Sequence, residues 1–254
     1  MKTITIANNK GGVGKTSTVL GLSDALSEAG RRVLVIDMDP QCNTTSTSKG
    51  ETDDRYTMFD ILREECTLSD TIQKRERYDL VPNDVLLSGR EAEFIVHLPK
   101  LKLLKKQLQS VKDNYDYAII DTPPNFGFYM TAALLASDGV IMPLDAGKYA
   151  VDGISQLLGF INDARSENEN MQIYGALITQ ADYRYGETKN FIKQLPELGK
   201  QNGFKVFKSI IRTCADIQKA QNHVESIYDY NRSSKAVKDF EAFAKELERT
   251  IKNG

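Results

Sequence analysis

Short apolar runs recur along the chain and alternate with longer stretches in which apolar residues have helical spacing. The runs are Thr3–Ala7, Val33–Ile36, Tyr78–Val81, Tyr117–Ile120, Gly139–Pro143 and Ile173–Thr179. Strands that are apolar on both faces are typical of a parallel sheet covered by helices, and their alternation with helices indicates βαβ units. We therefore expect an α/β fold in one domain, residues 1–254, with a mostly parallel, doubly wound sheet flanked by helices on both faces.

Two further stretches have a recognisable pattern. The polar residues 43–55 predict a mobile surface loop. Residues 91–112 predict a helix that faces the core, because leucines recur at helical spacing. These leucines are Leu98, Leu101, Leu104 and Leu108.

The overall charge excludes a polycationic nucleic-acid coat, because 33 basic residues stand against 35 acidic ones. The charge is nevertheless uneven: residues 184–254 hold 14 Lys and Arg against 9 Asp and Glu, a net charge of +5. An anionic partner is therefore best sought in the last quarter. The three cysteines are scattered and the histidines number two, which argues against a disulfide scaffold and a four-thiolate metal site.

No apolar run is long enough to span a membrane, and the chain opens directly into a predicted strand rather than a signal peptide. We therefore expect a protein of the reducing cytosol that does not bind membranes.

The strongest local pattern is a glycine-rich segment between the first apolar run and a helix-like stretch, residues 17–29. The segment consists of Asn9, Lys10, Gly11, Gly12, Val13, Gly14, Lys15 and Thr16, followed by Ser17. Glycines let backbone N–H groups surround phosphate oxygens, and the N-terminus of the next helix favours negative charge. We predict that residues 10–17 bind a nucleotide, with Lys15 at the β- and γ-phosphates and Thr16 on Mg²⁺.

Carboxylates follow two other predicted strands. Asp37 and Asp39 end the second run, and Asp121 ends the fourth, just before two prolines. Strand ends beside the phosphate-binding loop face the γ-phosphate in this topology. Asp39 is therefore the candidate to orient the attacking water, and Asp37 and Asp121 are candidates for the Mg²⁺ water shell.

These motifs resemble those of the ParA/MinD group of P-loop ATPases, and the resemblance covers nearly the whole chain. Lys10–Thr16 resembles the group's deviant Walker A motif, Asp37–Gln41 its Walker A′ motif, and residues 117–124 its Walker B strand and γ-phosphate-sensing segment. The resemblance implies an ATP-bound homodimer in which Lys10 of each subunit reaches the partner's nucleotide. Lys10, Lys15 and Asp39 are then the expected catalytic residues, with ATP and Mg²⁺ as cofactors.

The C-terminal quarter resembles the ParA ending. There, the neighbourhood of Ile211, Arg212 and Thr213 lies near adenine, and nearby basic residues touch DNA. This chain departs from the pattern at Ile211, where proline is common, and at Cys214, near which a second arginine is common. Candidate contacts to duplex DNA, without sequence preference, are Lys205, Lys208, Arg212, Lys219, Arg232, Lys235 and Lys238.

Three other functions were weighed. A MinD-like, membrane-cycling ATPase needs a basic amphipathic C-terminal helix. The tail after residue 239 has helical apolar spacing, but its polar face is near neutral, so we expect it to pack on the sheet. An iron–sulfur electron carrier like the nitrogenase iron protein needs suitably placed cysteines. An ATP-dependent ligase or kinase needs a substrate site, and none can be identified.

The sequence thus predicts a ParA-like, cytosolic and nucleoid-associated ATPase that partitions a plasmid, chromosome or mobile element. Its turnover is expected to be slow, because no built-in arginine finger is evident. The resemblance implies a ParB-like, centromere-binding partner that accelerates hydrolysis. Met1 stands one residue before the first strand, so we expect no N-terminal helix-turn-helix extension.

Overall fold

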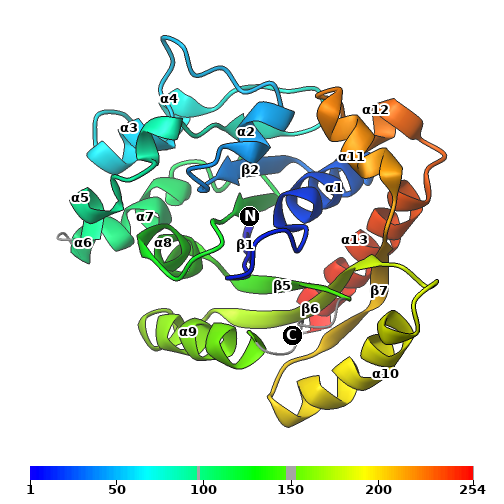
Figure 1. The fold of residues 1–254 in the computed structure, drawn as a ribbon. Coiled ribbons are helices and arrows are strands. Elements are labelled where there is room, and N and C mark those ends of the chain that lie inside the picture. The colour runs from blue at the N-terminus through cyan, green and yellow to red at the C-terminus, as the bar shows by residue number, and fades with distance from the viewer. Residues whose placement is uncertain (96–97, 147–152, 254) are drawn as a thin grey trace.

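The computed structural model describes residues 1–95, 98–146 and 153–253, and in these ranges seven strands form one sheet. All neighbouring strands are parallel, in the order β3-β2-β4-β1-β5-β6-β7 (Figure 1). The strands are β1 (Lys2–Ile6), β2 (Val33–Asp37), β3 (Asp79–Val81), β4 (Tyr117–Asp121), β5 (Gly139–Asp145), β6 (Gln172–Ala181) and β7 (Val206–Arg212). The predicted parallel, doubly wound sheet is confirmed.

Helices cover both faces of this sheet (Figure 1). On one face, α1 and α13 pack together through a core that includes Leu22, Phe240 and Phe243; on the other, α7, α8 and α9 cover the strands. The helices are α1 (Lys15–Glu28), α2 (Asn43–Thr47), α3 (Met58–Arg63), α4 (Leu68–Thr71), α5 (Glu91–Ile95), α6 (Leu98–Leu101), α7 (Leu103–Gln109), α8 (Phe128–Ala136), α9 (Ile154–Glu167), α10 (Gly186–Gln201), α11 (Ala215–Asn222), α12 (Ile227–Asn231) and α13 (Lys235–Asn253). A 3₁₀ turn spans Val85–Leu87.

The strand register brings the predicted site residues to one edge of the sheet. Ile6 of β1 lies opposite Asp121 of β4, and Asp121 lies opposite Asp37 of β2. β1 is flanked by β4 on one side and β5 on the other, so the chain winds away from it in both directions. Ligands of such sheets bind in the crevice at the carboxyl ends of the strands, at this point of reversal.

The sequence prediction missed β7 and misjudged α2. β7 is an edge strand whose exposed Lys208 and half-buried Ser209 interrupt its apolar pattern. The expected loop at residues 43–55 begins instead with α2, in which Thr44 and Thr45 are buried. Their hydroxyls bind buried carboxylates, so polar side chains point inward here.

The C-terminal tail packs as expected. In α13, Phe240, Phe243 and Leu247 are buried against α1 and the sheet, and Ile251 is partly buried there. None of the helices in the described ranges is long and apolar enough to cross a membrane. The expectation that the leucines of residues 98–108 face the core is confirmed for Leu104 and Leu108, which are buried. The side chain of Leu98 lies outside the described residues.

The packing of α1 on α13 can be tested at Gly21, where an added methyl group would overlap the Phe240 ring. We expect Gly21→Ala to lower the free energy of unfolding by about 1–3 kcal/mol, because the buried ring has no room to move. The matched control is Gly159→Ala in α9, which is exposed and has open space around the new methyl group. There the better helix propensity should raise stability by about 0.5–1 kcal/mol. Urea denaturation of both variants checks the pair; equal effects would contradict the packing.

Candidate nucleotide-binding site

The glycine-rich segment forms a loop that joins β1 to the start of α1. Gly12 and Gly14 have φ angles of 73° and 83°, in the left-handed region that favours glycine. Gly14 is the N-cap of α1 and no side chain caps it. The first backbone N–H groups of α1 therefore lack an intrahelical partner and are available to an anion.

Strands β5 and β6 hold this loop in place. Asn8 is buried; its Nδ2 donates to the Pro143 carbonyl at 2.6 Å, and its Oδ1 accepts from the Lys10 amide at 2.9 Å. On the other side, the Thr179 hydroxyl donates to the Val13 carbonyl at 2.8 Å. Asn8 and the Val13 carbonyl therefore tie the loop to the ends of β5 and β6.

A cleft of about 490 Å³ opens above this loop. Its described lining consists of Gly11, Gly12, Gly14, Lys15, Thr16, Ser17, Asp39, Gln41, Asn43, Thr47, Pro124, Gln180, Gln221 and Asn222. The cleft thus brings together the phosphate-binding loop, the β2–α2 segment and the segment after β4, which are far apart in the sequence. Val13, also predicted at the nucleotide, is buried and is not among these lining residues.

Lys15 is held among carboxylates beneath the loop. Its side chain is only 7% exposed, and its Nζ donates to the Lys10 carbonyl at 3.0 Å. Burial lowers the pKa of Lys15, while Asp121 and Asp39 oppose that shift. A buried ammonium with a remaining hydrogen-bonding capacity is suited to bind phosphate oxygens.

Lys10 is placed differently. Its ammonium forms an ion pair with Asp145 at 3.0 Å, and its side chain is 42% exposed. In the single chain Lys10 thus contacts its own β5 strand end. The role predicted for it across a dimer stays a prediction.

Thr16 and Asp121 lie together, as the sequence predicted. The hydroxyls of Thr16 and Thr44 both donate to Oδ2 of Asp121 at 2.7 Å, while its Oδ1 is buried and has no hydrogen-bond partner among the described residues. Burial raises the pKa of Asp121. A hydroxyl beside an unsatisfied carboxylate oxygen fits the hard oxygen ligands and water shell of Mg²⁺. The described residues offer no cluster of three or more His, Cys, Asp or Glu that could hold a metal ion.

Asp37 lies behind the cleft, where it binds the turn after β2. It is fully buried; its Oδ1 accepts from the Asp39 amide at 3.0 Å, and its Oδ2 accepts from the amide and hydroxyl of Thr45 at 2.8 and 2.7 Å. Asp37 is not among the residues that line the cleft. The structure therefore gives Asp37 the role of shaping the turn that carries Asp39, and its predicted contact with the Mg²⁺ water shell stays a prediction.

Asp39 itself lines the cleft and is 6% exposed. Its Oδ1 accepts from the Gln41 amide at 2.9 Å, and its carbonyl accepts from Nδ2 of Asn83 at 3.2 Å. Burial raises the pKa of Asp39, while the Gln41 bond and the Lys15 charge lower it. A fixed carboxylate near Lys15 can orient a water molecule that enters the cleft.

The predicted adenine contacts are not in the described wall of the cleft. Ile211 is buried in the core at 3% exposure, and the Thr213 hydroxyl donates to the Gln180 carbonyl at 2.8 Å. Arg212 binds Asp239 at 2.6 Å. The wall comes instead from side-chain amides that the sequence reasoning missed, namely Gln180, Gln221 and Asn222. These residues are far from the loop in the sequence, so no local sequence pattern could identify them.

The candidate DNA contacts fall into two groups. Arg212 and Arg232 already form ion pairs, with Asp239 and Glu28 respectively. The other five are exposed and, among the ion pairs of the described residues, have none. They are Lys205, Lys208, Lys219, Lys235 and Lys238.

Comparisons with known proteins agree with this geometry. The family described as an AAA domain matches residues 1–173. The sporulation initiation inhibitor protein Soj of Bacillus subtilis is 36% identical over 250 residues, which cover 97% of this chain and 98% of Soj. The chromosome partitioning protein ParA of Caulobacter vibrioides is 33% identical over 237 residues, 91% of this chain and 88% of that protein.

Among solved structures, a cobyrinic acid a,c-diamide synthase of Mycobacterium smegmatis with bound ADP and magnesium has a TM-score of 0.86. It is 28% identical, and the match covers all of this chain and 96% of that one. The sequence relatives, the matched family and the loop with its buried lysine and aspartates give one answer: the chain belongs to the ParA/Soj family of partition ATPases.

Proposed function

We propose that this protein is a switch ATPase for DNA segregation that binds ATP with Mg²⁺, dimerises in the ATP state and then binds DNA without sequence preference. The observation that carries the proposal is the cleft lined by the glycine loop with Lys15, Thr16 and Asp39, with the buried Asp121 bonded to Thr16 behind it. The nucleotide and magnesium in the diamide synthase structure support the same ligands here.

Each residue of the cleft has a proposed part in hydrolysis. Lys15 and the first amides of α1 hold the phosphates, and Thr16 and Asp121 hold Mg²⁺ directly and through water. The metal ion neutralises charge on the β- and γ-phosphates. Asp39 orients the attacking water, because its carboxylate is fixed at the cleft by Gln41 and Asn83.

Slow intrinsic turnover is part of the proposal, and the lining of the cleft supports it. Among the described residues that line the cleft there is no arginine. P-loop enzymes without an arginine finger hydrolyse nucleotide slowly. We propose that Lys10 of a second subunit supplies part of this charge after leaving Asp145, and that a ParB-like partner stimulates hydrolysis.

The DNA surface is proposed to consist of the five exposed lysines near β7, α11 and α13. Dimerisation doubles their number, and DNA affinity rises steeply with the number of phosphates contacted. Hydrolysis then removes the bridging γ-phosphate and releases both the dimer and the DNA. Plasmid, chromosome and mobile element are all compatible cargoes.

Two alternatives receive less support. A MinD-like membrane cycle needs a free apolar helix face, but Phe240, Phe243 and Leu247 of α13 are buried in the core. Biosynthetic chemistry like that named for the diamide synthase shares the fold, yet Soj is more similar in sequence over the same full length.

Lys15→Ala tests the nucleotide site. Loss of a buried cation at the phosphates should weaken ATP binding on the order of a hundredfold or more. Isothermal titration with Mg·ATP measures this, and Lys189→Ala, an exposed lysine of α10, serves as the control. Normal affinity in Lys15→Ala would end the assignment of the loop.

Asp39→Ala tests the hydrolytic role. The variant should bind ATP, dimerise and stay on DNA, while phosphate release falls by roughly 10²- to 10⁴-fold because the water loses its orienting carboxylate. Light scattering and a phosphate-release assay separate the two properties. Unchanged hydrolysis would move the catalytic role to another residue.

The DNA surface is tested with Lys235→Ala/Lys238→Ala. A random-sequence duplex should bind the unaltered protein only with ATP, and affinity should fall steeply with salt. In the double variant the slope of log K against log salt should flatten by about 2–4, because each dimer loses up to four contacts. Lys106→Ala/Lys112→Ala, exposed near the opposite face of the sheet, removes the same charge as a control. An unchanged slope would place the DNA elsewhere.

A further inference from the structure

Helix α11 forms one wall of the candidate nucleotide cleft. Gln221 and Asn222, at its C-terminal end, line the cleft, and Nε2 of Gln221 donates to the Ser17 hydroxyl at 3.1 Å. Ser17 belongs to the first turn of α1, directly after Thr16. The position of α11 against α1 therefore decides where these two amide side chains lie relative to a bound nucleotide.

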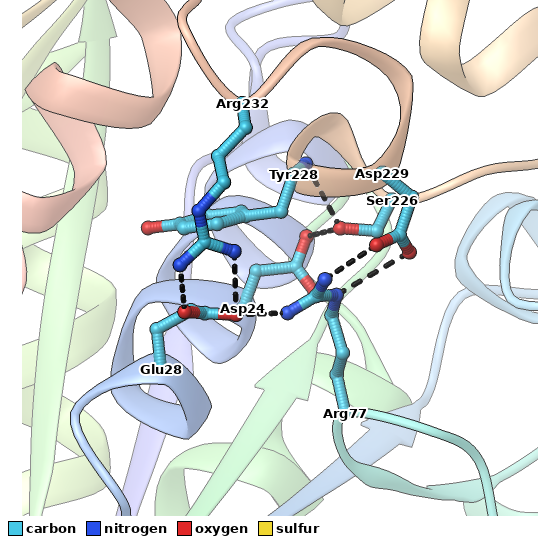
Figure 2. A network of polar contacts seen from close by, with 7 residues as sticks. All are labelled: Asp24, Glu28, Arg77, Ser226, Tyr228, Asp229 and Arg232. Carbon is cyan, nitrogen blue, oxygen red and sulfur yellow. Dashed lines mark hydrogen bonds and ion pairs between the residues drawn. The ribbon is translucent and has the colours of Figure 1, made fainter.

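A second anchor, further along α1, joins this helix to the N-terminus of α12, which directly follows α11. Ser226, the N-cap of α12, accepts from the Tyr228 amide at 3.1 Å and donates to Oδ2 of Asp24 at 2.6 Å (Figure 2). Asp24 is 2% exposed. It lies seven residues after Ser17, which is two helical turns, so both residues lie on the same face of α1. The two anchors therefore hold the turn between α11 and α12 against α1, one on each side of it.

An ion-pair network surrounds the second anchor (Figure 2). Arg77, in the segment before β3, binds Glu28 of α1 and Asp229 of α12. Arg232 binds the other oxygen of Glu28 at 2.6 Å. The network therefore ties α12 to the end of α1 around the buried Asp24.

Apolar packing leaves room between the anchors. A cavity of about 40 Å³ is lined by Ser17, Asp24, Gln221 and Ser226 among others, and Asp24 and Ser226 also line a second cavity of about 150 Å³. Oδ1 of Asp24 is buried and has no hydrogen-bond partner among the described residues. Ala220, Ile227 and Tyr228 do join the core that α1 lines, so apolar packing holds the seam, and the polar anchors fix its register beside these cavities.

We propose that Asp24 is a positioning residue for the nucleotide: through Ser226 it holds α11 against the phosphate-loop helix and so places Gln221 and Asn222 in the cleft. The inference rests on the proposed function, since it assigns part of the ATP affinity to a residue outside the cleft. It adds to that function a wall of the nucleotide cleft, and the position of this wall is set by Asp24, two helical turns further along α1.

The surroundings of Asp24 identify the variant that preserves the anchor. Burial raises the pKa of Asp24 to about 7, while the Ser226 bond and the Arg77 charge lower it and Asp229 and Glu28 raise it. The Tyr78 hydroxyl also faces this region, and its pKa is raised by burial and by Asp24. A neutral side chain is thus tolerated here, and asparagine keeps the acceptor that Ser226 needs.

The experiment compares Asp24→Ala, Asp24→Asn and Ser226→Ala in the full-length protein. Loss of the buried hydrogen bond frees α11, so both alanine variants should bind Mg·ATP about tenfold more weakly, whereas Asp24→Asn should bind within about twofold of the unaltered protein. In steady-state assays the alanine variants should raise KM for ATP and leave kcat unchanged, because Asp39 is not displaced. A residue that only stabilises the fold would lower Tm without this change in KM.

Arg31→Ala is the matched control. Arg31, just after α1, pairs with Glu248 of α13 at 2.7 Å, so its loss removes a C-terminal ion pair without touching α11 or α12. It should leave ATP affinity unchanged. ATP binding by the unaltered protein with unchanged affinity in both alanine variants would overturn this inference alone, whereas no ATP binding by the unaltered protein would overturn it together with the proposed function.

Hydrogen exchange on the unaltered protein tests the proposal even if an alanine variant fails to fold. In the unaltered protein, a non-hydrolysable ATP analogue with Mg²⁺ should increase the protection of backbone amides in residues 215–231 at least severalfold. The amides of α9, on the opposite face, should change little. Unchanged protection of residues 215–231 in protein saturated with the analogue would overturn the proposal.

Discussion

The structure depends on two carboxylates that are buried opposite each other at the carboxyl edge of the sheet. Asp37 and Asp121 are in register on β2 and β4, and neither is exposed. Burial raises the pKa of both, because a charge removed from water is costly unless donors surround it. Thr16, Thr44 and Thr45 supply these donors. The start of α1 and the whole of α2 are therefore fixed around the pair, and the cleft takes its shape from them.

This arrangement links the occupancy of the cleft to α2. One oxygen of Asp121 is shared by the hydroxyls of Thr16 and Thr44. In the proposed function, Thr16 contacts Mg²⁺, so metal binding changes the charge felt by the same carboxylate that holds Thr44. Asp37 and Thr45 extend the link to the backbone of Asp39. In the proposed switch, a nucleotide-dependent change would reach α2 and Asp39 through hydrogen bonds that already hold the fold.

The parts that could be predicted from the sequence are those with local patterns. The strands other than β7, the glycine loop and the pairing of Thr16 with Asp121 follow from apolar runs, glycines and strand ends. The role of α2 could not be predicted, because threonines in a polar stretch indicate a loop unless the buried carboxylates they satisfy are known. Gln221 and Asn222 were missed because they reach the cleft only after β7 and α11 fold back over α1.

Two lysines five positions apart have different freedom, and this difference suits a switch that needs a second subunit. Lys15 is 7% exposed among carboxylates, and its ammonium is bonded to the Lys10 carbonyl within the loop. The Lys10 ammonium forms an ion pair with Asp145, and the two side chains are 42% and 21% exposed. A pair this accessible to solvent contributes about 1 kcal/mol or less. Transfer of Lys10 to the phosphates of a partner therefore costs little, and charge-assisted hydrogen bonds in a dry dimer interface return more. In the proposed dimer, the nucleotide, rather than the protein surface alone, would supply free energy that holds the two subunits together.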